Sequence, residues 1–365
     1  MEAILTYALY SGVSLSSTVL FGKACRGEKC NKIALCIAII IPSVLSGFRG
    51  ASVGSDTGMY IHEYYDPGTF LFGSGFTRTF EPGWRVLRNV IYKAGMPHQV
   101  LFIVVQALTL VFLFLSARSE LDEIDVSVTM FVYMFDAYFQ SFNMMRQALA
   151  VAIVIYSYTK IANNKNIKGI CGIVLAGFIH QTAWVFLVVI LAKYILKSRH
   201  AKIYILIGII VAVFILANND VLQRIAYFFL GEKAIWYTTT SDTGSRLWVY
   251  LLKISPIVIL MALCIKEYFG KNKKVVFYAG LAMCGYILAS YGNFVATDAQ
   301  RMALYFSRLD AIVLGYAVMR KLYFWGRTYL SPNIIRRLIY AYAIVMFSYN
   351  YFYIGVSSIV PYSVD

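Results

Sequence analysis

The stretch "SFNMMRQALAVAIVIYSYTKI", from Ser141 to Ile161, decides the fold of this chain. Most of its residues are apolar, and it matches the roughly 20 residues that a helix needs to cross the hydrocarbon core of a bilayer. It nevertheless carries a permanent charge, Arg146, near its start. A charge at the bilayer centre costs about 2.5–3.5 kcal/mol on insertion scales. Arg146 therefore either snorkels to the headgroups or, as we favour, faces a buried cavity.

Similar apolar runs recur along the whole chain. Hydrophobic residues make up 60% of the 365 residues and charged residues 14%, which is too little charge for the surface of a soluble protein of this length. We predict one all-α polytopic integral membrane domain over residues 1–365, with about 11–12 transmembrane helices. The expected helices cover 4–21, 33–48, 99–116, 124–141, 144–162, 167–180, 182–196, 203–217, 247–265, 275–291, 302–319 and 338–355.

Basic residues orient these helices, because cytoplasmic loops carry an excess of lysine and arginine. The apolar run 167–196 has basic clusters at both ends. As one helix it would rise about 45 Å, too long for a hydrocarbon core of about 30 Å. Two shorter segments keep both clusters inside and place His180, Gln181 and Thr182 at an outer turn. The net charge of +15 is spread over such loops, so nucleic-acid binding is not expected.

Two outer loops are long, at about 49–98 and 218–246. The first contains "FEPGWRVLRNVIYKAGMP", which predicts a short amphipathic interfacial helix, with Pro82 in its first turn and Gly95 as its stop. Its apolar face is expected to be Trp84, Leu87, Val90 and Ile91, opposite Arg85 and Arg88. Both loops are candidates for covering a site at the outer face.

Several arginines fall at the level of that face: Arg49, Arg146, Arg301 and, less firmly, Arg246. Arginines at one level can form bidentate bonds to phosphate oxygens. A diphosphate at a membrane surface would belong to a lipid-linked substrate. The sequence contains no glycine-rich phosphate loop, and no histidine lies near the pair Cys25 and Cys30, so we expect no cofactor and no metal.

Other polar residues allow two interpretations each. His180 is either a packing residue or a proton acceptor or donor near neutral pH. Asp56 and Glu81 lie in the first outer loop, where capping a helix would already explain Asp56. Arg308 and Asp310 are two positions apart and do not share a helix face, so each is expected to have a partner on another helix. The pairs that Arg308 and Asp310 form would either stabilise the fold or belong to a substrate site.

Five segments in order resemble the EpsG family of polysaccharide polymerases, which belongs with the Wzy-type O-antigen and capsule polymerases. They are "GFRGASVGSDTGMYIHEYY" (Gly47 to Tyr65), "FEPGWRVL" (Phe80 to Leu87), "FNMMRQALAVAI" (Phe142 to Ile153), "FIHQTAW" (Phe178 to Trp184) and "RMALYF" (Arg301 to Phe306). The final Pro361 and Tyr362 also resemble the tail of that family. The resemblance covers roughly residues 45 to 362.

The resemblance implies a metal-independent, GT-C-like glycosyltransferase in the bacterial inner (cytoplasmic) membrane, with its active site facing the periplasm or exterior. Its substrates would be oligosaccharide units on undecaprenyl diphosphate, as both donor and acceptor. The usual partner would be a chain-length regulating co-polymerase, beside the membrane lipids. On this basis we expect Arg146 and Arg301, assisted by Arg49, to bind the diphosphate, and His180, then Asp56 and Glu81, to handle the acceptor hydroxyl.

Three alternatives remain at this point. A transporter or flippase of lipid-linked sugars would also place arginines and broken helices at membrane depth, but is expected to have internal repeats and charges nearer the midplane. A membrane acyltransferase would use an intramembrane histidine, with a donor tunnel from the cytoplasmic side. An O-antigen ligase shares the donor and is poorly separated from a polymerase by residue chemistry.

Overall fold

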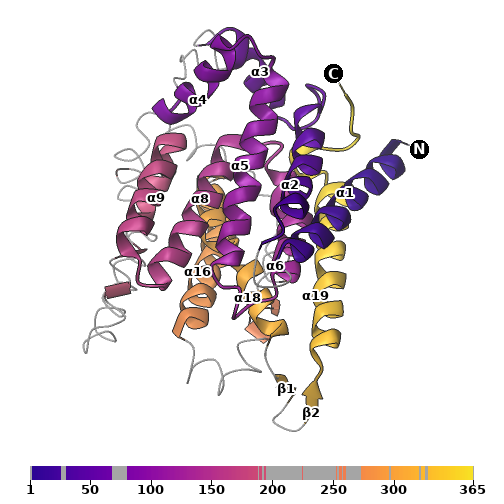
Figure 1. Cartoon of the computed structure of the whole chain (residues 1–365), viewed down its shortest axis with the longest axis vertical. Helices are drawn as coiled ribbons and strands as arrows, with labels where there is room; N and C mark the ends of the chain where they lie inside the picture. The colour runs from indigo at the N-terminus through magenta and orange to yellow at the C-terminus, as the bar shows by residue number, and fades with distance from the viewer. Residues whose placement is uncertain are drawn as a thin grey trace.

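The computed structural model describes residues 2–25, 30–67, 80–187, 189–190, 193–194, 224, 252, 255–256, 258–259, 273–295, 297–319, 322–324 and 328–364. The expected helix 203–217 and the outer loop 218–246, apart from Arg224, lie outside these residues, and so does the expected helix 247–265 apart from residues 252, 255–256 and 258–259. The described chain is a helical bundle (Figure 1). Its α-helices are α1 (Glu2–Ala24), α2 (Lys32–Gly47), α3 (Thr57–Tyr65), α4 (Pro82–Lys93), α5 (His98–Arg118), α6 (Val126–Phe135), α7 (Ala137–Gln140), α8 (Met145–Ala162), α9 (Asn166–Ile179), α16 (Lys273–Val295), α17 (Thr297–Ser307), α18 (Asp310–Val318) and α19 (Pro332–Phe347).

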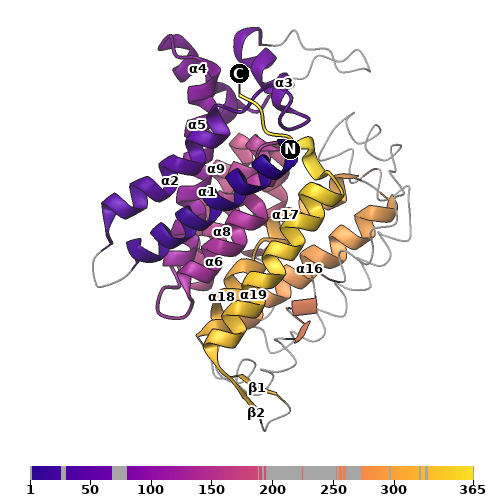
Figure 2. The same ribbon diagram turned by 90° about the vertical axis from the view of Figure 1, so that its right-hand side faces the viewer.

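The helices run between two ends of the bundle, and these ends differ. Helices α3 and α4 lie across one end, which we call the capped end, and a two-stranded hairpin lies at the other (Figures 1 and 2). The chain starts and finishes toward the capped end, where the backbone N–H of Tyr362 donates to the Thr6 hydroxyl.

Two helices among the described residues, α1 and α5, are long and apolar enough to cross a membrane. Three shorter helices or helix segments are also apolar, at Lys32–Gly47, Asn166–Ile179 and Lys274–Ala289. Many large apolar side chains on the outside of the bundle are exposed, including those of Ile4, Ile33 and Ile167. Exposed apolar side chains of this kind are compatible with contact with lipid.

The break predicted at His180 is confirmed. Helix α9 ends at Ile179, His180 is extended, and a 3-10 helix, η1 (Gln181–Leu187), follows. Helix α4 also forms where it was expected, with Pro82 in its first turn and Gly95 at φ +70° beyond its end. Glycine adopts that left-handed conformation readily, because it has no Cβ.

The face that α4 buries differs from the prediction. Trp84, Arg88 and Ile91 are buried, whereas Val90 is exposed. The cause is Arg88, whose guanidinium donates 2.7 Å to the carbonyl oxygen of Tyr64 on α3 and therefore turns inward.

Two helices that we expected to be continuous are broken. The run 124–141 divides into α6 and α7 at Asp136, and the run 302–319 divides into α17 and α18 at Arg308 and Leu309. Asp136 and Arg308 form an ion pair with each other. The hydroxyl of Tyr351 donates 2.8 Å to the carbonyl oxygen of Asp136. Partners from other helices thus satisfy polar groups at the breaks.

The C-terminal region departs from the prediction at two places. Two short strands, β1 (Leu322–Phe324) and β2 (Thr328–Leu330), pair in antiparallel fashion, so the described fold is helical with one added hairpin. Helix α19 begins earlier than the expected 338–355, because Ser331 caps it by accepting from Ile334 N–H and Pro332 follows in the first turn. It ends at Phe347 and continues as a π-helix, Ser348–Tyr353.

Candidate functional site

Arg146 lies in the first turn of α8 and is buried, with 3% of the residue exposed. Its guanidinium forms an ion pair with Glu81 and lies 3.8 Å from the centre of the Phe80 ring. Its Nε has no hydrogen-bond partner among the described residues. The structure therefore favours the prediction of a buried arginine over a side chain that snorkels to the headgroups.

Glu81 occupies the position before the first turn of α4, outside the long helices of the bundle. One carboxylate oxygen pairs with Arg146, and the other accepts from the Gln181 N–H at 3.3 Å. Burial by itself would raise the pKa of Glu81, but Arg146, His180 and backbone N–H groups outweigh it and hold that pKa below its ordinary value. Glu81 is therefore a carboxylate at neutral pH, joined to both α8 and the break after α9.

His180 lies at that break, and its side chain is held by two hydroxyls. Its Nδ1 lies 2.7 Å from the hydroxyl oxygen of Thr182 and 3.4 Å from that of Tyr305, and these two oxygens are 3.0 Å apart. The extended backbone of His180, at φ −149° and ψ 117°, turns the chain from α9 into η1. This turn brings the imidazole toward α17, the helix that carries Tyr305.

The backbone of Arg301 is hydrogen-bonded to the residue next to Arg146. Its carbonyl oxygen accepts 2.7 Å from the side-chain amide of Gln147, the residue that follows Arg146. Arg301 also lies one helical turn before Tyr305 on α17. The structure thus brings together the residues that we call the capped-end cluster: Glu81, Arg146, His180, Thr182, Arg301 and Tyr305.

Tyr305 was not among the residues predicted for the site. One available signal was its position four residues after Arg301, which places both on one face of a helix. The chain has 29 tyrosines, and most of them suit membrane interfaces equally well, so this position alone did not distinguish Tyr305 from the others.

Arg49 does not join this cluster. The residue is 0% exposed, and its guanidinium donates to Ser46, to the Thr57 hydroxyl at 3.3 Å and to the carbonyl oxygen of Phe142 at 3.1 Å. It ties the end of α2 to α3 and to the turn before α8. These hydrogen bonds give Arg49 a structural role, and its part in diphosphate binding stays a prediction.

Asp56 belongs to the same set of contacts between the first loop and the residues before α8. It precedes α3 but its side chain makes no capping hydrogen bond, contrary to the simple explanation that the sequence allowed. Its backbone N–H donates 2.8 Å to the side-chain oxygen of Asn143, which also accepts from the Ser55 hydroxyl at 2.6 Å. These bonds fix the first loop against the start of α8.

Arg308 and Asp310 have partners on other helices, as expected. Arg308 pairs with Asp136, and Asp310 accepts from the hydroxyl of Tyr286. Arg308 also lines a cavity between α5, α8 and α17 that Gln147 lines as well. The pairings explain both residues structurally. Arg246, the remaining arginine of the predicted set, lies outside the described residues.

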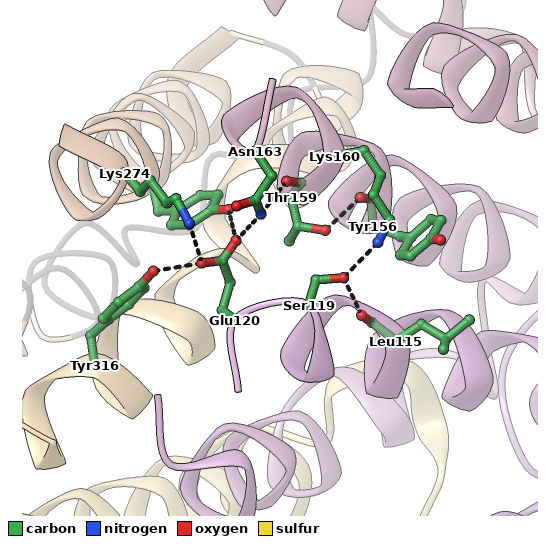
Figure 3. Close-up of polar contacts among 10 residues, drawn as sticks. Leu115, Ser119, Glu120, Tyr156, Thr159, Lys160, Asn163, Lys274 and Tyr316 are labelled. Atoms are coloured by element: carbon green, nitrogen blue, oxygen red, sulfur yellow. Dashed lines mark hydrogen bonds and ion pairs between the residues drawn. The ribbon is translucent and has the colours of Figure 1, made fainter. Parts of the chain in front are cut away.

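A second polar cluster surrounds Glu120 at the opposite end of the bundle (Figure 3). The carboxylate accepts 2.9 Å hydrogen bonds from the hydroxyls of Tyr278 and Tyr316, and it also bonds Asn163 and Lys274. Its side chain is fully buried, whereas that of Lys274 is 35% exposed. Glu120 thus joins α8, α16 and α18 to the turn after α5, and we interpret it as a structural tie.

The comparison with protein families gives one match. A family model described as the EpsG family matches residues 32–364, which is nearly the whole chain. No curated protein and no solved structure matches the chain. The matched range includes every member of the capped-end cluster.

Proposed function

This chain belongs to the EpsG family, whose members are similar to Wzy-type polysaccharide polymerases, and we propose that it is a membrane glycosyltransferase that polymerises oligosaccharide units linked to undecaprenyl diphosphate. The growing glycan leaves its lipid diphosphate and is joined to a hydroxyl of the acceptor unit. The observation that carries the proposal is the capped-end cluster, in which Arg146, Glu81, His180 and the backbone of Arg301 converge from separate segments.

The chemistry of transfer suits these side chains. The acceptor oxygen forms a bond to the anomeric carbon of the donor sugar, and the bond from that carbon to the diphosphate oxygen breaks. The electron pair of the broken bond leaves with the diphosphate, where Arg146 and Arg301 stabilise the growing negative charge. The proton of the acceptor hydroxyl passes to His180, which lies in the same cluster.

We propose two roles for Glu81, one without substrate and one with substrate bound. Without substrate its carboxylate neutralises Arg146, since both side chains are largely buried. A diphosphate carries more negative charge than a carboxylate, so it displaces Glu81 from Arg146 and frees Glu81 to orient the acceptor hydroxyl. Asp56 remains a third candidate for that orienting role.

We further propose that residues 1–365 form one polytopic integral membrane domain of the GT-C-like kind, with about 11–12 transmembrane helices. The capped end faces the exterior or periplasm of the bacterial inner membrane. Support comes from the basic residues near the opposite end of the bundle, including Lys160, Lys165 and Lys274, which are expected on the cytoplasmic side. A chain-length regulating co-polymerase is the expected partner.

Complementation of a polymerase-deficient strain tests the function. Wild-type protein should restore a ladder of polymer on a gel, and Arg146→Ala or His180→Ala should leave a band of single units. Each variant must be present in the membrane at the wild-type level, which an epitope tag measures. Failure of the wild-type chain to restore polymer in its own host, with lipid-linked units accumulating, would contradict the proposal.

The same experiment separates the alternatives. A ligase would leave polymer accumulated on the lipid carrier when it is deleted. If the chain were a flippase, its deletion would leave single units on the cytoplasmic side of the membrane, where an external glycosidase cannot reach them. An acyltransferase would change the mass of the unit without changing polymer length.

A further inference from the structure

Three polar atoms from two segments meet at the break after α9. They are Nδ1 of His180, the hydroxyl oxygen of Thr182 on η1 and the hydroxyl oxygen of Tyr305 on α17, with separations of 2.7, 3.0 and 3.4 Å. The imidazole is therefore held on its Nδ1 side by protein hydroxyls. Neither the family match nor the proposed function assigns a part to these hydroxyls.

The Tyr305 hydroxyl has a fixed position. Tyr305 is 0% exposed, and its ring stacks on that of Phe186 with 4.3 Å between the ring centres. The backbone of α17 is held one turn earlier by the hydrogen bond from Gln147 to the carbonyl oxygen of Arg301. The hydroxyl therefore cannot turn away to solvent, and its partners are the groups that the fold places beside it.

The hydrogen-bonding capacity of these groups allows an arrangement with the proton on Nδ1. A hydroxyl oxygen has two lone pairs, so the Thr182 oxygen can accept from the Tyr305 hydroxyl and from a protonated Nδ1 together. The partner of one imidazole nitrogen decides which nitrogen of a neutral histidine carries the proton. With the proton on Nδ1, Nε2 has the lone pair that a base requires.

We propose that Tyr305 and Thr182 are positioning residues that hold His180 through Nδ1, so that Nε2 receives the proton of the acceptor hydroxyl. The inference rests on the proposed function for the identity of that hydroxyl. The way in which His180 is held is a separate property, which can be measured without any reaction.

The first test reads the protonated nitrogen directly. The full chain, labelled with ¹⁵N-histidine and held in detergent micelles at neutral pH, gives imidazole ¹⁵N signals, and comparison with His180→Gln identifies those of His180. The wild-type protein should show the proton on Nδ1. Thr182→Val should move it to Nε2, Tyr305→Phe should give a mixture, and Thr182→Ser should restore the wild-type signals.

A matched control is available in Tyr158→Phe. Tyr158 is also a buried tyrosine, and its ring stacks on Phe306, which contacts Phe186. Its hydroxyl, however, has no hydrogen-bond partner among the described residues. This variant should leave the His180 signals unchanged. The signals of the other histidines report whether each variant keeps its fold. Unchanged His180 signals in both Thr182→Val and Tyr305→Phe would overturn the inference.

The second test uses polymerisation of a purified lipid-linked unit. Thr182→Val and Tyr305→Phe should each lower kcat by about tenfold or more with little change in KM, because they disturb proton transfer and not binding. If the wild-type chain does not polymerise, the proposed function fails while the ¹⁵N result still stands. If the wild-type chain polymerises and both variants keep its kcat, the positioning role alone is wrong.

Discussion

The side-chain amide of Gln147 donates a hydrogen bond to the backbone carbonyl of Arg301, with 2.7 Å between nitrogen and oxygen. Gln147 follows Arg146 on α8, whereas Arg301 lies on α17, 154 positions further along the chain. The bond therefore holds together the two backbone segments whose arginines we propose to bind one diphosphate. Because it involves a carbonyl oxygen, it leaves both guanidinium groups to other partners.

Replacing Gln147 by leucine should separate these segments. The variant loses a hydrogen bond worth about 1 kcal/mol and leaves the Arg301 carbonyl without that donor, so KM for the lipid-linked substrate should rise several-fold. Thr109→Val is a matched control, since Thr109 lines the same cavity but donates only to Val105 of its own helix. Equal losses in both variants, measured with purified substrate, would contradict the specific role of Gln147.

The ion pair between Arg146 and Glu81 allows stability and function to be separated. Arg146→Ala leaves Glu81 buried without its cationic partner, which should cost about 3–5 kcal/mol of unfolding free energy. Adding Glu81→Gln removes the unpaired charge and should recover most of that loss. Polymerisation should stay absent in the double variant, because the diphosphate still lacks Arg146. Recovery of polymer together with stability would show that Arg146 acts through folding alone.

The lowered pKa of Glu81 predicts how stability changes with pH. The unfolded chain binds this proton more readily than the folded protein, so the contribution of Glu81 is complete above its ordinary pKa of about 4.3. It is lost as pH falls below that value toward the folded pKa. The difference in unfolding free energy between wild type and Glu81→Gln should therefore be constant from pH 7 to about pH 5 and shrink in more acidic buffer. A difference that grows with acidity would contradict the ion pair.

The helix break at His180 could be predicted because its causes are local and electrostatic. Basic clusters at both ends of the run 167–196 cannot both be cytoplasmic if one helix crosses the membrane once. Likewise Pro82 and Gly95 mark the ends of α4 through backbone conformations that the residue type controls. Such features depend on neighbouring residues in the sequence, so one sequence is sufficient to find them.

The breaks at Asp136 and at Arg308 depend on a different kind of information. Either residue alone is a charged side chain within an apolar run, and only their meeting explains why α6 and α17 both end there. The burial of Arg49 also depends on tertiary contacts, because its acceptors Ser46, Thr57 and Phe142 lie on three separate segments. A level in the membrane can be inferred from loop charges, but the direction in which an arginine points depends on tertiary packing.

Glu120 should matter for stability and not for the reaction. Glu120→Ala leaves the hydroxyls of Tyr278 and Tyr316 without their acceptor, and it should cost about 3 kcal/mol. Glu2→Ala removes an exposed glutamate and should change stability by less than about 0.5 kcal/mol. Polymer length and rate per folded molecule should be normal in both variants. Denaturant unfolding in mixed micelles measures the first quantity, and a change in polymer length for Glu120→Ala would argue against a purely structural tie.

Two glycines of α16 give opposite expectations for the same substitution. A Cβ at Gly285 would lie 2.4 Å from the backbone nitrogen of Ser307, whereas a Cβ at Gly280 would have no neighbour within 4 Å. Gly285→Ala therefore pushes α17 away from α16 and should cost about 1–3 kcal/mol. Gly280→Ala should instead stabilise α16 by up to about 1 kcal/mol, the difference in helix propensity.

The same pair of variants tests whether α17 positions the site. Because α17 carries Arg301 and Tyr305, its displacement in Gly285→Ala should reduce polymerisation by more than the loss of folded protein explains. Gly280→Ala should polymerise at the wild-type rate. The measurement is the rate per folded molecule at a temperature where both variants remain folded. Equal rates in the two variants would mean that the place of α17 against α16 does not control the reaction.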